Sequence, residues 1–391
     1  MLDWLIIGGG VHGTHLSYHL TTIERVPRER LRVLDPNEAP LARWDACTAN
    51  CGMAFLRSPG SHHLDVNPWA LMQFANSRFP ASSSFLAGYH RRPALALFRA
   101  HAQHVIERHR LAELRLRGHA VAVDDTSRGL RVETTQGAIE ARRVIIAIGA
   151  SEQPLWPAWA RELRGGGNPV DHVYDPGFQR TALSSWSRLV VVGGGLGAVQ
   201  TALALAREAP GTVTLLMRHG IREHEFDTDT AWTDGAHIDA FTWERDLEKR
   251  RQVIAAARHR GSVPREIRAE LCRAIARDQL AIEIGEVDAA DRMADGWIRL
   301  GIESDQRALF ADRVVLATGF APDRPGGAWL DRTIAELGLG CAACGYPLVD
   351  RSLRWHPGLY VSGALAELEI GPAARNIVGA RLAAARISEA A

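Results

Sequence analysis

A glycine-rich turn that occurs twice constrains this chain more than any other feature. The first copy follows the apolar run 5–7 and contains Gly8, Gly10 and Gly13 in the pattern G-x-G-x-x-G. In such a turn the first glycine permits the tight bend and the second lets backbone N–H groups approach a pyrophosphate. The third lets the next helix pack closely on the strand. The succession of strand, turn and helix predicts a dinucleotide-binding unit; an incidental structural turn is the alternative.

The second copy lies near the middle of the chain, after the apolar run 189–192. It contains Gly193, Gly195 and Gly197, and a helix is expected to follow. Two copies of one unit make an internal repeat. We therefore expect an α/β fold with two Rossmann-like dinucleotide-binding domains.

The strand that follows each copy ends in a residue of opposite charge. Asp35 ends the first such strand, and Arg218 ends the second, with Arg222 close by. A carboxylate at this place accepts a hydrogen bond from a ribose 2′-hydroxyl and repels a 2′-phosphate, whereas an arginine does the reverse. We therefore expect FAD in the first unit, bound through its AMP half, and NADPH rather than NADH in the second. The alternative is that Arg218 is an ordinary surface residue.

Further glycines stand where a backbone can approach a cofactor. Gly149, Gly319 and Gly363 each end an apolar strand-like run, and Gly371 opens the C-terminal helix. The positive N-terminal end of that helix would suit the pyrimidine edge of a reduced flavin, although a helix merely docked on the core is the alternative. The full set of expected cofactor contacts is Gly8, Gly10, Val11, His12, Gly13, Asp35, Gly149, Gly193, Gly195, Leu196, Gly197, Arg218, Gly319, Gly363 and Gly371.

Length and composition are typical of a globular protein of several domains. The chain has 391 residues, of which 46% are hydrophobic and 23% are charged, with a net charge of +1. We expect an FAD domain over 1–155, an NAD(P)H domain over 156–317 and a returning part of the FAD domain over 318–391. The small net charge provides no field to attract nucleic acid or an anionic membrane. No apolar run approaches the length of a membrane span.

The number of cysteines and the first residues of the chain indicate the cellular compartment in which the protein is expected. Five cysteines in a chain of this length indicate a reducing cytoplasm rather than a disulfide framework. The chain enters its first strand at once, so no signal peptide is expected. A homo-oligomer is compatible with the sequence, which does not fix the oligomeric state.

Two stretches of the first domain are expected to differ in structure. Apolar residues alternate over 113–148, which predicts a small antiparallel β meander. The stretch 36–57 mixes proline, asparagine, glycine and cysteine, and is predicted to be mainly loop.

A polar loop over 58–65 and its neighbour Arg57 supply candidates for a substrate site. Arg57, His62 and His63 concentrate ionisable groups in one short stretch, and loops between scaffold elements often carry chemistry. A solvated surface loop without function is the alternative. A second polar stretch, 219–261, contains four basic residues that are expected to form a solvated helix face: Arg250, Arg251, Arg258 and Arg260.

Together these features resemble the two-dinucleotide-binding-domain flavoproteins over nearly the whole chain. Within that superfamily, the stretch from Asp312 to Pro325, with its core Leu-Ala-Thr-Gly-Phe, is similar to the signature of the flavin-dependent N-hydroxylating monooxygenases. These include the lysine and ornithine hydroxylases of siderophore synthesis. Phe320 stands where the signature usually has tyrosine, and His172 resembles the linker histidine of the class B flavin monooxygenases.

The resemblance implies a reaction between NADPH, O2 and a small-molecule substrate. In that family NADPH delivers hydride to FAD, the reduced flavin adds oxygen to form a C4a-hydroperoxide, and a nucleophilic substrate such as an amine attacks the distal oxygen. The protein has to exclude water, since hydrogen peroxide is otherwise lost. An amine reacts only when neutral, and a partly desolvated pocket lowers its pKa. Arg57, His62 and His63 would then hold a substrate carboxylate or the flavin.

Two other functions fit parts of the same sequence. A disulfide or electron-transfer reductase would use the pair Cys47 and Cys51, or the pair Cys341 and Cys344, and it needs a low-pKa thiol against the flavin. A flavin-binding sensor without substrate turnover is the second alternative. A metal site is not expected, because the cysteine pairs lack enough further ligands at suitable spacing.

Overall fold

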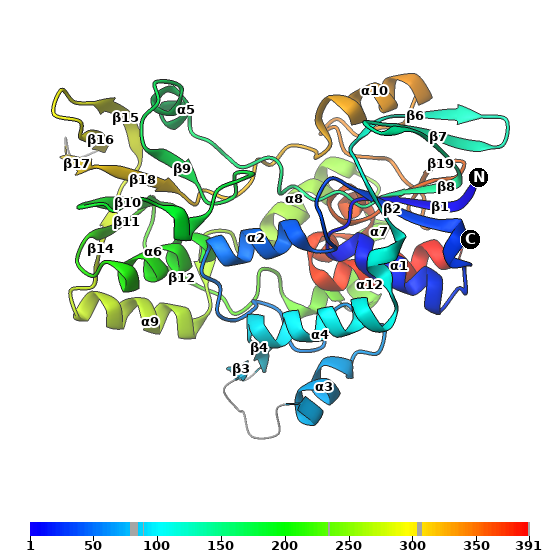
Figure 1. The fold of residues 1–391 in the computed structure, drawn as a ribbon, viewed down its shortest axis with the longest axis horizontal. Helices are drawn as coiled ribbons and strands as arrows, with labels where there is room; N and C mark the ends of the chain where they lie inside the picture. Colours follow the sequence, from blue (N-terminus) through cyan, green and yellow to red (C-terminus); the bar gives the residue numbers. More distant parts are fainter. Residues whose placement is uncertain (79–84, 89, 234, 303–306, 390–391) are drawn as a thin grey trace.

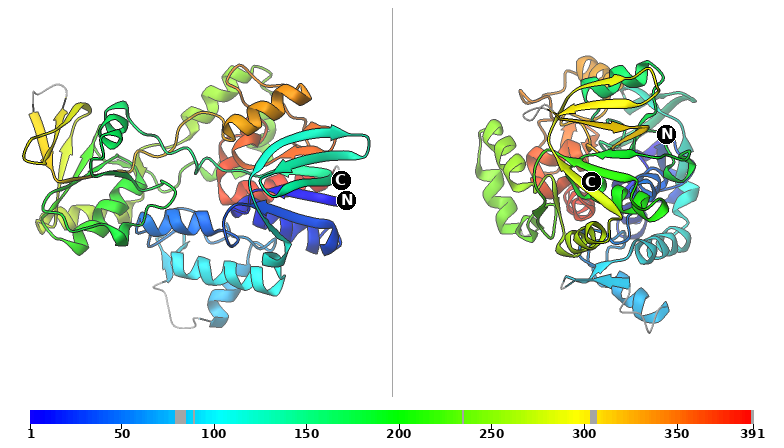
Figure 2. Two further views of the ribbon diagram at one scale, coloured as in Figure 1. Left: turned by 45° about the horizontal axis from the view of Figure 1, so that its top comes forward. Right: turned by 90° about the vertical axis from the view of Figure 1, so that its left-hand side faces the viewer.

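The computed structural model describes residues 1–78, 85–88, 90–233, 235–302 and 307–389. Two α/β units lie side by side along the long axis of the molecule, each built on its own sheet (Figure 1). The chain passes from the first unit to the second and returns, so both termini lie in the same unit (Figure 2). The predicted α/β class with two parallel-sheet units is confirmed.

The first unit is built on an eight-stranded sheet. Its order is β19-β20-β8-β1-β2-β5, and β7 joins β6 to β8. The strands are β1 (Leu2–Ile7), β2 (Leu31–Asp35), β5 (Arg115–Arg117), β6 (Ala120–Thr126), β7 (Gly129–Thr134), β8 (Gly137–Ile146), β19 (Arg354–His356) and β20 (Leu359–Val361). β1 pairs in parallel with β2 and β8. Successive residues Leu5 and Ile6 are both fully buried, as expected for a central strand covered on both faces. β6, β7 and β8 pair antiparallel, which confirms the predicted meander.

The helices of the first unit cover its sheet or pack on one another. They are α1 (Val11–Thr22), α3 (Ala70–Arg78), α4 (Leu95–Arg108), α10 (Gly327–Leu337), α11 (Glu367–Ile370) and α12 (Ile377–Ser388), and a short hairpin pairs β3 (Leu86–Ala87) with β4 (Arg92–Pro93). The alanine-rich α12 packs on α1, because its small buried residues Ala383 and Ala384 allow close approach. None of the helices in the described residues combines the length and the apolar character that crossing a membrane requires.

The second unit is built on a five-stranded parallel sheet of order β14-β11-β10-β18-β9. Its strands are β9 (Val170–His172), β10 (Leu189–Val192), β11 (Val213–Met217), β14 (Leu280–Ile284) and β18 (Arg313–Leu316), and its helices are α5 (Ala158–Gly165), α6 (Leu196–Glu208) and α9 (Arg265–Ala276). A three-stranded antiparallel sheet of β15 (Val287–Arg292), β16 (Ile298–Ile302) and β17 (Arg307–Ala311) precedes β18 in the chain. β10 and α6 therefore repeat the arrangement of β1 and α1.

A helix within the predicted loop 36–57 joins the two units. The stretch 36–57 was predicted to be mainly loop, and α2 (Ala42–Asn50) shows that this prediction is wrong for its middle part. Its last residue, Asn50, donates from Nδ2 to the carbonyls of Val173 and Phe178, at 3.2 and 2.7 Å, and accepts from the backbone N–H of Arg180. These contacts attach a helix of the first unit to the segment that leads into the second.

The stretch 219–261 packs on the first unit, although the chain enters it from the second. It contains β12 (Arg222–Glu223), α7 (Gly235–Trp243) and α8 (Leu247–Ala257), and β12 pairs with β13 (Ser262–Val263). The expectation of a solvated basic face is wrong for three of its four arginines. The side chains of Arg250, Arg251 and Arg258 are only 12, 21 and 12% exposed, because they bond to acceptors in the segment 367–372 and to Asp227. Arg260 is exposed, as expected.

The packing of α1 on β1 predicts different effects of alanine at two neighbouring glycines. A methyl group at Gly13 would lie 1.7 Å from the carbonyl oxygen of Gly8, whereas nothing lies within 4 Å of one at Gly10. We expect G13A to lower the free energy of unfolding of the cofactor-free protein by about 1–3 kcal/mol. G10A is the control and should leave it nearly unchanged, as measured by urea denaturation. Equal stability of the two variants would contradict the close helix packing.

Candidate cofactor and active site

The first glycine turn forms a cradle at the N-terminus of α1. Gly8 has φ +112°, and a Cβ there would lie 2.7 Å from the carbonyl oxygen of Ala147 at the end of β8. Gly10 is the N-cap of α1, and no side chain caps the helix. The first N–H groups of α1, at Val11 and His12, therefore have no intrahelical acceptor, and nothing lies within 4 Å of a Cβ built on Gly10. This geometry fits a pyrophosphate.

Asp35 lies beside this cradle, at the end of β2. Its Oδ2 accepts from the backbone N–H of Gly9 at 2.6 Å, and its Oδ1 accepts from the backbone and side-chain nitrogens of Asn37, both at 2.8 Å. These bonds fix the carboxylate at the edge of a small recess. The recess is lined by Gly9, Thr14, Ser17, Val33, Asp35, Ala39, Pro40, Leu111 and Arg115. A fixed acceptor beside a recess fits the ribose of a dinucleotide.

The second glycine turn repeats the first. Gly193 has φ +150°, and a Cβ there would lie 2.5 Å from the carbonyl oxygen of Ala317 at the end of β18. Gly195 is the N-cap of α6 and again no side chain caps the helix, which begins at Leu196. A Cβ at Gly197 would lie 2.2 Å from the hydroxyl of Tyr174, so the linker segment also packs on this turn. The second cradle fits a pyrophosphate for the same reasons as the first.

Arg218 lies just beyond β11, beside the second cradle. Its side chain is 72% exposed, and its nearest carboxylate is that of Glu286 at 3.5 Å, itself exposed. Exposed ion pairs of this kind are weak. The next residue, His219, lies against the turn, with its ring 3.4 Å from the position of a Cβ on Gly194. The guanidinium of Arg218 is therefore accessible to an anionic ligand group.

The remaining expected glycines lie around these two cradles. The backbone N–H groups of Ala147 and Ala317 each donate to the neighbouring strand, at Ile7 and Val192, both at 2.8 Å, so β8 and β18 end beside the cradles. Gly149 and Gly319 each lie three residues beyond the end of their strand. The linker histidine His172 is buried, and its Nε2 lies 3.1 Å from the hydroxyl of Thr318. The two stretches that carry the family resemblance are therefore in contact.

The first cradle contacts the C-terminal segment through His12. His12 Nε2 donates to the carbonyl of Asn376 at 3.2 Å, and its Nδ1 lies 2.8 Å from the hydroxyl of Ser362. Burial lowers the pKa of His12 to about 4, so the ring is neutral at pH 7. Gly363 lies against the same ring, with the Cβ position 3.6 Å from Nδ1. Asn376 is the N-cap of α12, and no side chain caps this helix either.

Gly371 lies under the stretch 219–261. It has φ +88°, and a Cβ there would be 3.5 Å from the ring of Phe241 and 3.7 Å from that of Trp232. The two rings lie edge to face, with centroids 5.9 Å apart. An aromatic pair therefore covers the turn that was expected to contact the flavin.

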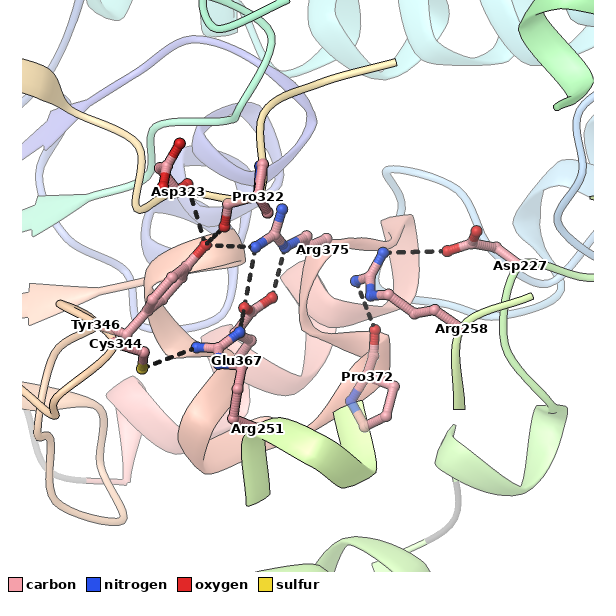
Figure 3. Close-up of polar contacts among 10 residues, drawn as sticks. All are labelled: Asp227, Arg251, Arg258, Pro322, Asp323, Cys344, Tyr346, Glu367, Pro372 and Arg375. Carbon is pink, nitrogen blue, oxygen red and sulfur yellow. Dashed lines mark hydrogen bonds and ion pairs between the residues drawn. The ribbon is translucent and has the colours of Figure 1, made fainter. Parts of the chain in front are cut away.

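An ion-pair network that sequence analysis missed supports this turn (Figure 3). The carboxylate of Glu367 is fully buried and pairs with Arg251 of α8 and with Arg375. Arg375 also donates to the hydroxyl of Tyr346 at 2.6 Å, and the guanidinium of Arg251 lies 4.0 Å from the centre of the same ring. Although burial by itself raises it, the two guanidinium groups hold the pKa of Glu367 below its ordinary value. The sequence signal for this network was two acidic residues shortly before Gly371 and Arg375 shortly after it.

The structure separates the three candidate substrate residues by environment. The guanidinium of Arg57 donates to the carbonyls of His224, Glu225 and Ser262 and to the hydroxyl of Ser262. Four of its five N–H groups are thereby used within the protein. Within the described part of the chain, Arg57 forms no hydrogen bond with His62 or His63.

His62 and His63 lie in the first unit near Arg381 of α12. His63 accepts from the backbone N–H of Asp65 and donates from Nε2 to the carbonyl of Pro68, both at 3.2 Å. Burial lowers the pKa of His62 to about 4 and that of His63 to about 3. Both rings are therefore neutral at pH 7.

Of the two cysteine pairs expected for a reductase, the pair Cys47 and Cys51 is not activated. The thiol of Cys51 is buried and donates to the hydroxyl of Tyr174 at 3.2 Å. Burial raises the pKa of Cys51 to about 12, and it also raises that of Cys47. A thiol at such a pKa is protonated at pH 7 and is a poor nucleophile. Across the described ranges, no group of three or more His, Cys, Asp or Glu side chains is placed to hold a metal ion.

Comparisons with known proteins agree with this geometry. Residues 50–384 match the pyridine nucleotide-disulphide oxidoreductase family. No sequence among curated proteins matches the chain significantly.

Several solved structures share the whole fold. The cadaverine monooxygenase DfoA of Erwinia amylovora, bound to FAD, has a TM-score of 0.77 and 16% identity, covering 100% of this chain and 95% of that one. The ornithine N-hydroxylase KtzI of Kutzneria sp. 744, with reduced FAD, NADP⁺ and L-ornithine, has a TM-score of 0.77 and 18% identity, covering 100% and 98%. The bacillithiol disulfide reductase Bdr of Bacillus cereus has a TM-score of 0.61 and 17% identity, covering 100% and 98%.

The buried histidines predict a loss of stability in acid. Burial lowers the pKa of His15 and His63 to about 3 and that of His101 to about 4, from 6.5. Between pH 6.5 and about 4 the unfolded chain binds protons at these sites and the folded protein does not, so stability falls as the pH falls. Each histidine contributes a slope of about 1.4 kcal/mol per pH unit.

H101F tests this slope. It removes one buried imidazole and keeps a ring between Phe74 and His63, so the dependence of unfolding free energy on pH should be shallower by about 1.4 kcal/mol per unit. Replacing the exposed His119 by phenylalanine is the control, measured by urea denaturation between pH 4.5 and 6.5. An unchanged slope in H101F would contradict the burial of this histidine in the neutral form.

Proposed function

Because the chain belongs to the pyridine nucleotide-disulphide oxidoreductase family, we propose that it is a flavoprotein monooxygenase that uses FAD, NADPH and O2. Its substrate in this proposal is a small molecule with a nucleophilic, amine-type group. FAD, when bound, accepts hydride from NADPH and activates oxygen. The chain's residues bind the two cofactors, keep water out and hold the substrate in its neutral form.

The protonation state of the Cys51 thiol is the observation that favours a monooxygenase over a disulfide reductase. A disulfide reductase needs a thiolate next to the flavin, and burial instead raises the pKa of Cys51 to about 12. The likeness over full length to the cadaverine and ornithine monooxygenases supports the same choice, since the disulfide reductase is less similar in fold. Oxygen transfer to an amine requires no protein thiol.

In this proposal the two cradles hold different cofactors. The turn at 8–13 with Asp35 holds FAD, and the turn at 193–197 with Arg218 holds NADPH through its 2′-phosphate. We assign residues 1–155 and 318–391 to the FAD domain and 156–317 to the NADPH domain. We place the protein in the reducing cytoplasm, in keeping with five free cysteines.

The candidate substrate residues have different roles in this proposal. His62 and His63 remain candidates for substrate contact, because neutral imidazoles do not repel a cationic amine on its way into the site. Arg57 has at most one N–H group left for a substrate. It therefore holds the segment 224–225 in place and does not form a bidentate pair with a substrate carboxylate.

Oxygen uptake separates the proposed activity from its alternatives. We expect FAD-reconstituted protein to consume O2 and NADPH together, and an N-hydroxylated product to form from a suitable amine. The variant in which Cys47, Cys51, Cys341 and Cys344 are all serine should keep this activity within about twofold. Loss of turnover in the serine variant together with NADPH-dependent disulfide reduction by the wild type would favour the reductase. Flavin that NADPH does not bleach under anaerobic conditions would favour a sensor.

Arg218 should set the preference for NADPH. R218A removes the exposed guanidinium beside the second cradle, and we expect kcat/KM for NADPH to fall about tenfold, with that for NADH changed less than about twofold. Arg277 is a matched control, because it precedes β14 and lies at the opposite end of the parallel sheet. Equal losses with both coenzymes in R218A would show that this residue does not recognise the 2′-phosphate. Anaerobic flavin reduction by each coenzyme provides the measurement.

A further inference from the structure

Resting on the proposed function, we propose that Glu367 is a positioning residue for FAD, which acts through Arg375 and ties α8 to the turn 371–376. The network therefore makes the stretch 219–261 part of the FAD site, although the chain enters it from the other unit. Figure 3 shows the residues that form this connection.

Glu367 joins four segments that are distant in sequence. Its carboxylate pairs with Arg251 from α8 and with Arg375, at the end of the turn. Through Arg375 it reaches Tyr346, whose hydroxyl donates to the carbonyls of Pro322 and Asp323, at 3.1 and 3.2 Å. These two carbonyls belong to the segment that returns from the second unit to the first. One buried negative charge therefore connects α8, the turn 371–376, Tyr346 and the returning segment.

The charge of Glu367 is needed because two cations meet it away from water. Its side chain is 1% exposed, and those of Arg251 and Arg375 are 21 and 20% exposed. Removing one partner of a buried pair leaves the other charges uncompensated. An uncharged residue at 367 would therefore let the two guanidinium groups repel each other, and Arg375 would no longer be fixed.

From Arg375 the connection continues to the first cradle. The next residue is Asn376, the N-cap of α12, and its carbonyl accepts from Nε2 of His12. His12 lies in the glycine turn that fits the pyrophosphate. Arg258 holds the other end of the turn, because it donates to the carbonyl of Pro372 at 2.9 Å. The turn is thus held at both ends by groups that depend on 219–261.

The neighbouring Glu369 provides a matched control. It also lies on α11, and it also pairs with an arginine of α8, Arg250 at 3.1 Å, and with Arg386 of α12 at 3.3 Å. In contrast to Glu367, it forms no ion pair with Arg375 in the described residues. A comparison of E367Q with E369Q therefore shows whether an effect comes from losing the support of the turn 371–376 or only from weaker packing of α8.

The test is a titration of cofactor-free protein with FAD, followed by its fluorescence and visible spectrum. We expect E367Q to raise the dissociation constant of FAD about tenfold and to shift the spectrum of the bound flavin, with E369Q within about twofold of the wild type. Circular dichroism confirms that each variant is folded at the temperature of the titration. R251Q removes the partner from α8 and leaves the pair of Glu367 with Arg375, so it should show a smaller effect in the same direction. It replaces E367Q if that variant does not fold.

Each outcome decides the inference. Equal FAD affinities for E367Q and E369Q, or an unchanged constant and spectrum in E367Q, would overturn it while leaving the proposed function intact. If E367Q does not fold, an R251Q variant indistinguishable from E369Q would overturn it in the same way. Wild-type protein that binds no FAD would instead overturn the proposed function, and the inference with it.

Discussion

Both units depend on one kind of contact, in which the first turn of a helix packs closely against the end of a strand. Glycine makes this contact possible. At Gly13 a single added methyl group would collide with the carbonyl of Gly8, and at Gly193 one would collide with that of Ala317. This closeness leaves the N-terminal N–H groups of α1 and α6 uncapped. Because a helix end without a side-chain cap has to find other acceptors, each unit presents a site for an anion. The loops, linkers and C-terminal segment are arranged around these two sites.

Features that depend on short stretches of sequence were the ones that could be predicted. The two glycine turns, the carboxylate at Asp35 and the meander each arise within a few neighbouring residues, where the pattern and the structure have the same cause. α2 could not be found in this way. It begins after Leu41, which has φ +64°, and its buried residues, Thr48 and Asn50, are polar. Asn50 bonds to residues more than a hundred positions away, which no local pattern indicates.

The same reasoning explains why the arginines of α8 were misjudged. A basic helix face in isolation favours solvent, and the sequence around Arg250 and Arg251 contains nothing that contradicts this. Their acceptors are supplied from positions 116 to 119 residues later, in α11. Sequence analysis thus located the two glycine turns, but not the network behind Gly371, and the cofactor contacts that it expects stay predictions. The roles of Arg57, His62 and His63 stay predictions.

Burial has three different effects in this molecule, and together they favour oxygen chemistry over thiol chemistry. It keeps the thiol of Cys51 protonated, so this thiol is a poor nucleophile. It keeps the imidazole of His12 neutral beside a cradle for negatively charged phosphates, where it acts as a hydrogen-bond donor to Asn376 rather than as a cation. At Glu367 a buried charge persists, because two guanidinium groups compensate it. In the proposed function, a protonated Cys51 and a neutral His12 suit a site that protects a reactive oxygen species from water.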